Sequence, residues 1–435
     1  MNLNSGASMI FSEILCSLIF IASFITTRQA LGLGVAASLA AGYLYGILRA
    51  NLDSPVGQLV YDAALAGLFL GCLSRRIRRT ERARLRLLFP WALALIGWPT
   101  LLLFVPSQPF LVQLVGWRGN VLFVPFILIG AALEQRELLR IARCVAVFNL
   151  VALAFATAEV FLSVARFYPN NALDAIIFKS SDVYFAGAGH LRIPATFTHS
   201  AAYASTMLAT LPLLFGGFRN EQSRWRQRLF LSSIAASGIG VFLAASRSAA
   251  VELLIFLVGI SFINFRSRLT PRYWILAVSI VAAVVGFSPR MQRFETLTDL
   301  RMVKDRLHES VNGSLIDLLI QYPLGNGLGG GGTSMPYYLS GQVHNPVGIE
   351  NEYSRLLAEQ GLPGLLMWLG FVVWLLKQRP LVRSSSWTIG WRLARIYCAI
   401  SFVTAQLGTG MLNAIPQSAF LMIYAGWIGS SSRSL

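Results

Sequence analysis

The stretch SAAYASTMLATLPLLFGG at residues 200–217 decides the fold class, because it carries no charged side chain along its whole length. A second uncharged stretch, LFLSSIAASGIGVFLAA at residues 229–245, follows it after a short segment that holds four arginines. An α-helix needs about 20 mostly apolar residues to cross the ~30 Å hydrocarbon core of a membrane. The two stretches therefore predict a pair of membrane-spanning helices joined by a basic turn.

The composition extends this prediction to the whole chain of 435 residues. Charged residues make up 13% of it and hydrophobic residues 55%, whereas a soluble globular domain carries roughly 25% charged residues. Apolar runs of spanning length recur on both sides of the first two. We expect an all-α, polytopic integral membrane protein with about 12–13 transmembrane helices. The predicted spans lie at residues 8–27, 30–48, 57–73, 87–106, 117–133, 144–164, 200–217, 229–245, 249–265, 273–288, 356–376, 396–411 and 417–430.

Arginine accounts for most of the formal net charge of +17, and its placement orients the spans. A basic chain can bind nucleic acid, but here the arginines cluster between apolar runs, as they do in cytoplasmic loops of membrane proteins. We therefore expect no nucleic-acid partner, an external N-terminus and an odd number of spans. The basic clusters predicted to be cytoplasmic lie at residues 74–86, 219–228, 266–272 and 377–395.

Two long segments then fall on the non-cytoplasmic side, at residues 165–199 and 289–355. The second has apolar residues at helical spacing over residues 302–321, which predicts short helices within a large loop. The sequence YPLGNGLGGGG at residues 322–332 predicts a flexible or tightly turning segment. The predicted regions are an N-terminal one at 1–199, with transmembrane helices and the first loop, and a C-terminal one at 200–435, with the large loop.

Metal and cofactor signatures are absent from the sequence. The cysteines Cys16, Cys72, Cys144 and Cys398 lie in or beside apolar runs without CxxC spacing, so neither a disulfide framework nor a zinc site is expected. No Walker loop, HExxH or GxSxG motif occurs. We expect no metal and no cofactor. No basic segment precedes the first apolar run, which predicts a mature helix rather than a cleavable signal peptide.

Two arginines break the predicted sidedness. Arg192 lies in RIPATFTHS, just before the uncharged stretch at residues 200–217, and Arg247 lies in the short turn between two predicted spans. An arginine at a membrane edge often reaches for headgroups or anchors the interface. The alternative is an anion-binding site, because the planar guanidinium stays charged and offers five donors.

Acids and histidines also gather towards the non-cytoplasmic side. Asp62, Glu159 and Glu252 lie in the outer halves of predicted spans, where a charge needs a partner or water. Glu252 follows Arg247 by five residues, and either a structural ion pair or a catalytic role fits this spacing. The four histidines are on the same side, although each alone fits an ordinary polar loop residue; they are His190, His199, His308 and His344.

The stretch HNPVGIENEYSRLLAEQGLPG at residues 344–364 collects His344, Glu350, Glu352 and Arg355 at the mouth of a predicted span. Acids are favoured at a helix N-terminus by the helix dipole, so a solvated helix start is one interpretation. A catalytic constellation is the other. His199 and Glu252 are further candidates, as is Arg306 in the large loop.

In combination, four segments resemble the O-antigen ligase and O-antigen polymerase superfamily. They are RIPATFTHS, LAASRSAAVELL, PLGNGLGG and NEYSRLLAEQGLPGLL, in that order. The resemblance covers about residues 190–376, and the earlier spans match only in kind. Each segment is short, and their order, spacing and sidedness carry the resemblance.

The resemblance implies a polytopic glycosyltransferase of the bacterial inner membrane with its active site facing the periplasm. Its donor would be an oligosaccharide on undecaprenyl diphosphate, and Arg192 and Arg247 would hold the diphosphate without a metal. Its partners would be this lipid-linked donor, a glycan or lipid A–core acceptor, membrane lipids and other polysaccharide-assembly proteins. The general base stays open between Glu350 and His344.

Glu350 stands where ligases of this superfamily usually place a histidine. This favours a polymerase of O-antigen or exopolysaccharide repeat units. One alternative is a ligase that moves glycan to lipid A–core, in lipopolysaccharide synthesis, or to protein. An alternative of another class is a transporter or flippase for lipid-linked sugar, which should show repeat symmetry; none is visible in the sequence.

Overall fold

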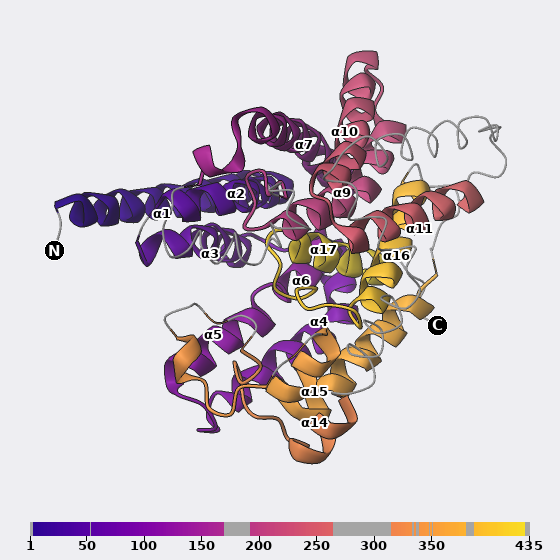
Figure 1. Cartoon of the computed structure of the whole chain (residues 1–435). Coiled ribbons are helices and arrows are strands. Elements are labelled where there is room, and N and C mark those ends of the chain that lie inside the picture. Colours follow the sequence, from indigo (N-terminus) through magenta and orange to yellow (C-terminus); the bar gives the residue numbers. More distant parts are fainter. Residues whose placement is uncertain are drawn as a thin grey trace, which may run out of the picture. The chain divides into compact units, whose positions relative to one another are not determined.

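The structure of the chain is a computed structural model (Figure 1). It describes residues 3–52, 54–168, 192–263, 315–332, 335, 339–347, 349, 351–379 and 387–430. Within these ranges every element of regular secondary structure is a helix, which confirms the all-α prediction.

Eight helices in the described part of the chain are long and apolar enough to cross a membrane, which confirms a polytopic membrane protein. These helical stretches are Ser8–Gln29, Leu31–Asn51, Val56–Leu73, Arg79–Leu102, Phe110–Ala132, Gln135–Leu162, Ser200–Asn220 and Glu352–Lys377. Within them, Val56–Leu73 begins with a 3-10 turn, and Phe110–Ala132 consists of two consecutive helices. Three further predicted spans are helices that are shorter or less apolar, at residues 229–245, 249–265 and 417–430. The predicted span at residues 396–411 is displaced: the helix covers Thr388–Thr404, and residues 405–411 form turns that include Gly410 at a φ of 114°. The predicted span at residues 273–288 lies outside the described residues.

The chain folds into two compact units, and each takes residues from both halves of the sequence. Unit 1 comprises Met1–Arg76, Leu133–Thr298 and Ser384–Leu393. Unit 2 comprises Ile77–Ala132, Asp299–Arg383 and Ala394–Leu435. This division differs from the predicted one at residue 199, because helices distant in sequence pack on one another within each unit.

Unit 1 is built from long helices that pack along their sides. Its helices are α1 (Leu3–Gln29), α2 (Leu31–Asn51), α3 (Val60–Leu73), α7 (Gln135–Leu162), α9 (Ser200–Asn220), α10 (Arg224–Leu243) and α11 (Arg247–Ile263), with 3-10 turns at Val56–Leu59 and Val164–Arg166. Figure 1 shows α1, α2 and α3 side by side, and α2 also packs on α7. In turn α7 packs on α9 and α10, so α2 and α7 link the two helix groups.

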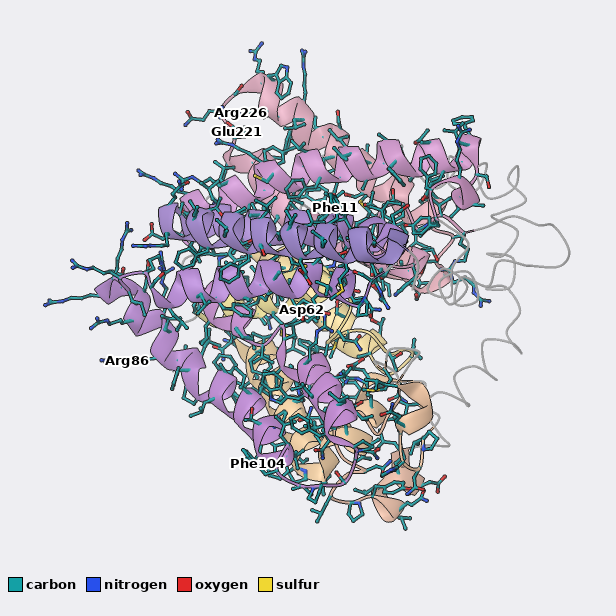
Figure 2. All side chains as sticks on the ribbon, turned by 90° about the vertical axis from the view of Figure 1, so that its left-hand side faces the viewer. Phe11, Asp62, Arg86, Phe104, Glu221 and Arg226 are labelled. Atoms are coloured by element: carbon teal, nitrogen blue, oxygen red, sulfur yellow. The ribbon has the colours of Figure 1, made fainter. Side chains whose placement is uncertain are left out.

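One face of α1 consists of exposed apolar side chains. The spacing of Phe11, Ile14, Leu18 and Ile21 is helical, and each side chain is about half exposed or more. Figure 2 labels Phe11 on this face. In water such a stripe would be an association surface, whereas lipid tails solvate it without cost, so the stripe fits a helix that faces the membrane.

A buried amide joins four helices of unit 1. The Tyr43 hydroxyl of α2 donates to Asn149 Oδ1 of α7 at 2.6 Å. The Asn149 amide nitrogen donates to Thr210 Oγ1 of α9 at 2.8 Å and to Ser237 Oγ of α10 at 2.9 Å. Polar groups buried in an apolar bundle need such partners, and this network fixes the register of α2, α7, α9 and α10.

One end of unit 1 carries ordinary ion pairs. Glu221, just beyond α9, bonds Arg143 of α7 at 2.7 Å and lies 3.7 Å from Arg226 of α10; Figure 2 labels Glu221 and Arg226 together. Burial opposes the charge of Glu221, but the hydrogen bonds from Arg143 and the Ser223 backbone and the charges of both arginines hold the pKa of Glu221 below its usual value. This end matches the predicted basic cluster at residues 219–228.

In unit 2, helices α4 (Arg79–Leu102), α6 (Pro125–Ala132) and α15 (Glu352–Lys377) pack against a short helix, α17 (Gln417–Ser430), whose residues from Ser418 to Gly429 are all buried. The unit also contains α5 (Phe110–Val121), α14 (Leu315–Gln321) and the second half of α16 (Thr388–Thr404), with a 3-10 turn at Ser340–Gln342. A Cβ on Gly130 of α6 would overlap the Ile423 backbone of α17, so glycine permits this close approach. At ~1.5 Å per residue, α17 is too short to cross a membrane alone.

Candidate functional site

The loop that leads into α9 contacts the turn between α10 and α11. Arg192 Nε in this loop donates to the Ala244 carbonyl in that turn at 3.1 Å. Ala245 adopts a φ of 48°, a left-handed conformation that closes the turn within a few residues. Arg247 is the next helix's first residue. Two arginines far apart in sequence are therefore carried by contacting segments at one end of unit 1.

Two buried side chains, those of Glu159 and Tyr168, form hydrogen bonds to the backbone of the loop at residues 192–199, which contains Arg192. Ala195 has a φ of 51°, and its N–H donates to Glu159 Oε2 of α7 at 2.8 Å. The Tyr168 hydroxyl donates to the Ala195 carbonyl and, at 3.1 Å, to that of Phe197. A strained residue persists where its surroundings fix it, so Glu159 and Tyr168 determine where Arg192 is presented.

The last turn of α2 also contacts this loop. Ile47 N donates to the Thr196 carbonyl at 3.1 Å. A Cβ on Gly46 would overlap the carbonyl group of Phe197, so only glycine allows this approach of helix to loop. The last turn of α2 is thereby set against residues 192–199.

His199 closes the loop as the N-cap of α9. Its Nδ1 accepts a hydrogen bond from Ala202 N at 3.1 Å, which leaves the ring proton on Nε2. Burial and the positive charges of Arg192 and Arg49 lower the pKa of His199 to about 4. At neutral pH His199 is an uncharged imidazole among cations, and Nδ1 is already occupied.

Arg49 was missed in the sequence analysis. It lies in the last turn of α2, and its guanidinium lies 6.0 Å from the ring centroid of Tyr45. The charge of Arg49 acts on His199 together with that of Arg192. A signal was available, because Arg49 directly follows the predicted span at residues 30–48 and breaks the sidedness trend as Arg192 and Arg247 do. We refer to Arg49, Arg192 and Arg247 as the arginine cluster.

Unit 2 contains a different charged group at the start of α15. Arg355 donates through Nε and Nη2 to Glu352 Oε1, the first at 2.9 Å, and through Nη1 to Glu359 Oε2 at 3.1 Å and to Asn120 Oδ1 at 3.2 Å. Glu352 Oε2 accepts from Gly410 N at 2.7 Å. Arg355 and Glu352 have no exposed side-chain surface. Of the two interpretations of this stretch, the solvated helix start does not hold for Glu352 and Arg355, because both are buried and the fold supplies their partners.

The glycine-rich segment packs tightly against this buried group. Gly325, Gly327 and Gly329 have φ values of 88°, 88° and 79°, which favour glycine. A Cβ on Gly331 would lie 3.0 Å from Glu359 Oε1. Of the two predicted alternatives, the tightly turning segment is the one that the structure shows.

His344 lies on a loop that is tied to this segment by its backbone. Gln108 accepts from His344 N at 2.8 Å and donates to the His344 carbonyl at 2.9 Å. Asn326 of the glycine-rich segment donates to the same carbonyl at 3.2 Å. The His344 side chain is exposed. The His344 backbone is therefore held in place while its imidazole stays accessible to a substrate that could donate a proton to it.

The predicted site residues thus belong to two units. Arg192, Arg247 and His199 lie at one end of unit 1, as does Glu252 in the second turn of α11. Unit 2 holds His344, Glu352 and Arg355. Glu350 and Arg306, like His190 and His308, lie outside the described residues. All four cysteines are free, and the described residues hold no group of three or more metal-ligating side chains.

No protein-family model matches the chain, and no curated protein sequence matches it. The resemblance to the O-antigen ligase and polymerase superfamily therefore stays a prediction that rests on the quoted residues. Two guanidinium groups near a neutral imidazole, with Arg247 on the segment that the Arg192 loop contacts, define a class of site on chemical grounds alone. Such a cluster suits an anion with several oxygen atoms, such as a phosphate or diphosphate ester.

Proposed function

We propose that this membrane protein is a glycosyltransferase that uses an undecaprenyl-diphosphate-linked glycan as donor. The observation that carries the proposal is the arginine cluster, in which the Arg192 loop bonds the turn that leads into Arg247. An anionic leaving group needs preorganised cations where its charge develops. A polyprenyl diphosphate is such a leaving group, and it reaches the protein through the membrane.

In the proposed reaction an acceptor hydroxyl attacks the anomeric carbon of the donor sugar. The new bond forms between the hydroxyl oxygen and that carbon, and the bond from the carbon to the diphosphate oxygen breaks. The diphosphate leaves with the electron pair and is stabilised by the guanidinium groups of Arg192 and Arg247. The hydroxyl proton goes to a general base, for which Glu350 and His344 are the candidates.

We also propose that the arginine cluster faces the periplasm and that the protein lies in the bacterial inner membrane. The opposite end of unit 1 carries Arg143, Glu221 and Arg226, and basic clusters of this kind favour the cytoplasm. Cysteine labelling in a background without native cysteines tests the orientation. Ser248→Cys and Gly341→Cys should react with an impermeant reagent from the periplasm, and Gln222→Cys should not; labelling of Gln222→Cys alone would reverse the orientation.

The transfer itself is tested with purified protein and an undecaprenyl-diphosphate-linked oligosaccharide. We expect release of undecaprenyl diphosphate and a longer glycan, with the same rate in the presence of EDTA because guanidinium groups supply the positive charge. Arg192→Gln is the matched inactive control. Absence of any product from folded wild-type protein with donor and acceptor present would remove the transferase proposal.

Within this reaction class we favour a polymerase of polysaccharide repeat units over a ligase. Glu350 in place of a ligase histidine supports the polymerase, and His344 remains the alternative general base in either reaction. A deletion strain distinguishes the two. Loss of polymer while the single lipid-linked unit persists supports the polymerase, and accumulation of full-length lipid-linked polymer supports the ligase.

A further inference from the structure

We infer that Arg49 is a third residue of the diphosphate site. The inference deepens the proposed function and rests on it for the identity of the anion. Its starting point is a polar atom without a partner: Arg49 Nε is enclosed by the protein and makes no hydrogen bond to any residue that the structure describes. A buried charged donor left unsatisfied is costly, so an acceptor from outside the chain is expected.

The place of Arg49 points to the same anion that Arg192 and Arg247 would bind. The last turn of α2 is fixed against the Arg192 loop by Ile47 N and the Thr196 carbonyl, at 3.1 Å. Arg49 and Arg192 both lower the pKa of His199, so both charges lie near one imidazole. His199 adds no further charge to the cluster because it stays neutral.

The stabilisation of a helix C-terminus by a cation does not account for this arrangement. A basic residue in the last turn is favoured by the helix dipole when it lies near the surface. That effect gives no reason to enclose Nε or to place the charge of Arg192 near the same imidazole. Like charges in proximity repel each other, and a bound polyanion removes the repulsion.

A third guanidinium group would stabilise the negative charge that develops on the diphosphate during the proposed reaction. In the donor each phosphate of the diphosphate carries two ester or anhydride links, and transfer of the sugar frees one oxygen of the diphosphate. The leaving diphosphate therefore carries additional negative charge compared with the donor. A cation that meets this charge stabilises the transition state more than the bound donor.

The chain provides a matched control in Arg28. Its guanidinium lies 5.9 Å from the ring centroid of Phe24, as that of Arg49 lies 6.0 Å from that of Tyr45. Each arginine lies in the last turn of its helix and four residues after the aromatic residue. Arg28 is at the opposite end of α2 from Arg49, beside the start of that helix. If the loss of any arginine stacked in this way weakens anion binding or stability, Arg28→Gln and Arg49→Gln should show the same effect.

The experiment compares Arg49→Gln, Arg49→Lys and Arg28→Gln in the purified full-length protein. Farnesyl diphosphate serves as a soluble probe of the anion site, and its Kd is measured by titration calorimetry. We expect Arg49→Gln to weaken binding roughly ten- to a hundredfold, the loss of a charge-assisted hydrogen bond. Arg49→Lys should weaken it less, and Arg28→Gln should bind as the wild type does.

Equal Kd values for Arg49→Gln and Arg28→Gln, with both proteins folded, would overturn the inference. If Arg49→Gln fails to fold, the comparison of Arg49→Lys with the wild type decides, because the charge at the helix end is kept. Glycan transfer is measured in parallel. If farnesyl diphosphate binding depends on Arg49 while the wild type transfers no glycan, the anion site stands and the transferase proposal falls. If wild type and Arg49→Gln transfer glycan at equal rates, the transferase proposal stands and the inference about Arg49 falls.

Discussion

Arg355 of unit 2 and Arg49 of unit 1 both lie within one turn of the end of a membrane-spanning helix, but their surroundings differ. Arg355 has no exposed surface and bonds two carboxylates and an amide of its own unit. Arg49 is partly exposed, stacks on Tyr45, and has an enclosed Nε without a described acceptor. In the sequence both lie at the edge of an apolar run, but Arg355 has acidic neighbours at Glu352 and Glu359, whereas Arg49 has no acidic residue within three positions.

The difference separates a structural arginine from one that we propose binds a ligand. A wholly buried arginine such as Arg355, with four of its five donors bonded by its own unit, fixes the fold and is enclosed from any ligand. In Arg49, by contrast, the enclosed Nε has no acceptor among the described residues. The partners supplied by the chain therefore distinguish the two roles, and the following predictions test this distinction.

The largest effect is expected for Arg355→Met. Removal of one partner from a buried ion pair leaves the carboxylates of Glu352 and Glu359 uncompensated, which costs about 3–5 kcal/mol. A loss of this size is a large part of the stability of a domain. We expect little folded protein, measured by yield after size-exclusion chromatography in detergent and by thermal unfolding.

Two control variants test whether the loss of stability comes from the uncompensated carboxylates. Arg355→Met combined with Glu352→Gln and Glu359→Gln removes the charges together, and replacement of a whole buried ion group is often close to neutral. The combined variant should regain most of the folded yield. Arg140→Met, in an ion pair whose arginine is 46% exposed, should unfold like the wild type. A normal yield of Arg355→Met alone would contradict the structural role.

Arg247→Lys should affect turnover and leave folding unchanged. Lysine keeps the charge but loses the planar fork that forms two parallel hydrogen bonds to a diphosphate. The lost bond is worth roughly 1.5–3 kcal/mol, so turnover with the lipid-linked donor should fall roughly ten- to a hundredfold. Arg192→Lys should behave alike. Wild-type turnover in a folded Arg247→Lys protein would reduce this residue to an interface anchor.

A smaller effect is expected where α2 contacts the Arg192 loop. Gly46→Ala adds a Cβ against the Phe197 carbonyl group, and overpacking of this kind costs about 1–3 kcal/mol. The loop must shift to relieve it, so turnover should fall together with the unfolding temperature. Gly238→Ala is the control, because nothing lies within 4 Å of its added Cβ. It should be neutral or stabilising by up to about 1 kcal/mol; equal effects of both substitutions would deny Gly46 a specific role.

The helical fold could be predicted from the sequence because lipid imposes a simple rule on it. Uncharged runs such as residues 200–217 must be helices in a membrane, and each predicted span in the described part of the chain overlaps a helix. The bounds agree less well: α4 begins at residue 79 instead of 87, α7 at 135 instead of 144 and α16 at 388 instead of 396. The short buried helix α17 was predicted as a span because a run of apolar residues is the same for lipid and for a protein core. The composition of the two units could not be predicted, since it depends on contacts between distant helices.

The candidate site was predictable in part. Charge placement against the sidedness trend singled out Arg192 and Arg247, and the same rule applied to residue 49 would have added Arg49. The burial of Glu352 and Arg355 could not be read from the sequence, because it depends on distant partners: Asn120 bonds Arg355 and the Gly410 backbone bonds Glu352. The same holds for Glu159, whose role depends on the Ala195 backbone.

His199 allows the smallest and most specific test of the comparison. Burial, Arg192 and Arg49 lower the pKa of His199 to about 4, below the 6.5 of an ordinary imidazole. The unfolded chain therefore binds the proton first as the pH falls. The stability that neutral His199 contributes is fully present above about pH 6.5 and is lost as the pH falls from there towards 4.

His199→Asn removes the titrating group and keeps a good N-cap for α9. Between pH 7.5 and 4.5 the unfolding temperature of the wild type should therefore fall more steeply than that of His199→Asn. Arg49→Gln removes one of the two charges that lower the pKa, so its curve should lie between them. Parallel curves for wild type and His199→Asn would mean that the imidazole does not sense the arginine cluster, and Arg49 would then resemble a surface charge rather than part of an anion site.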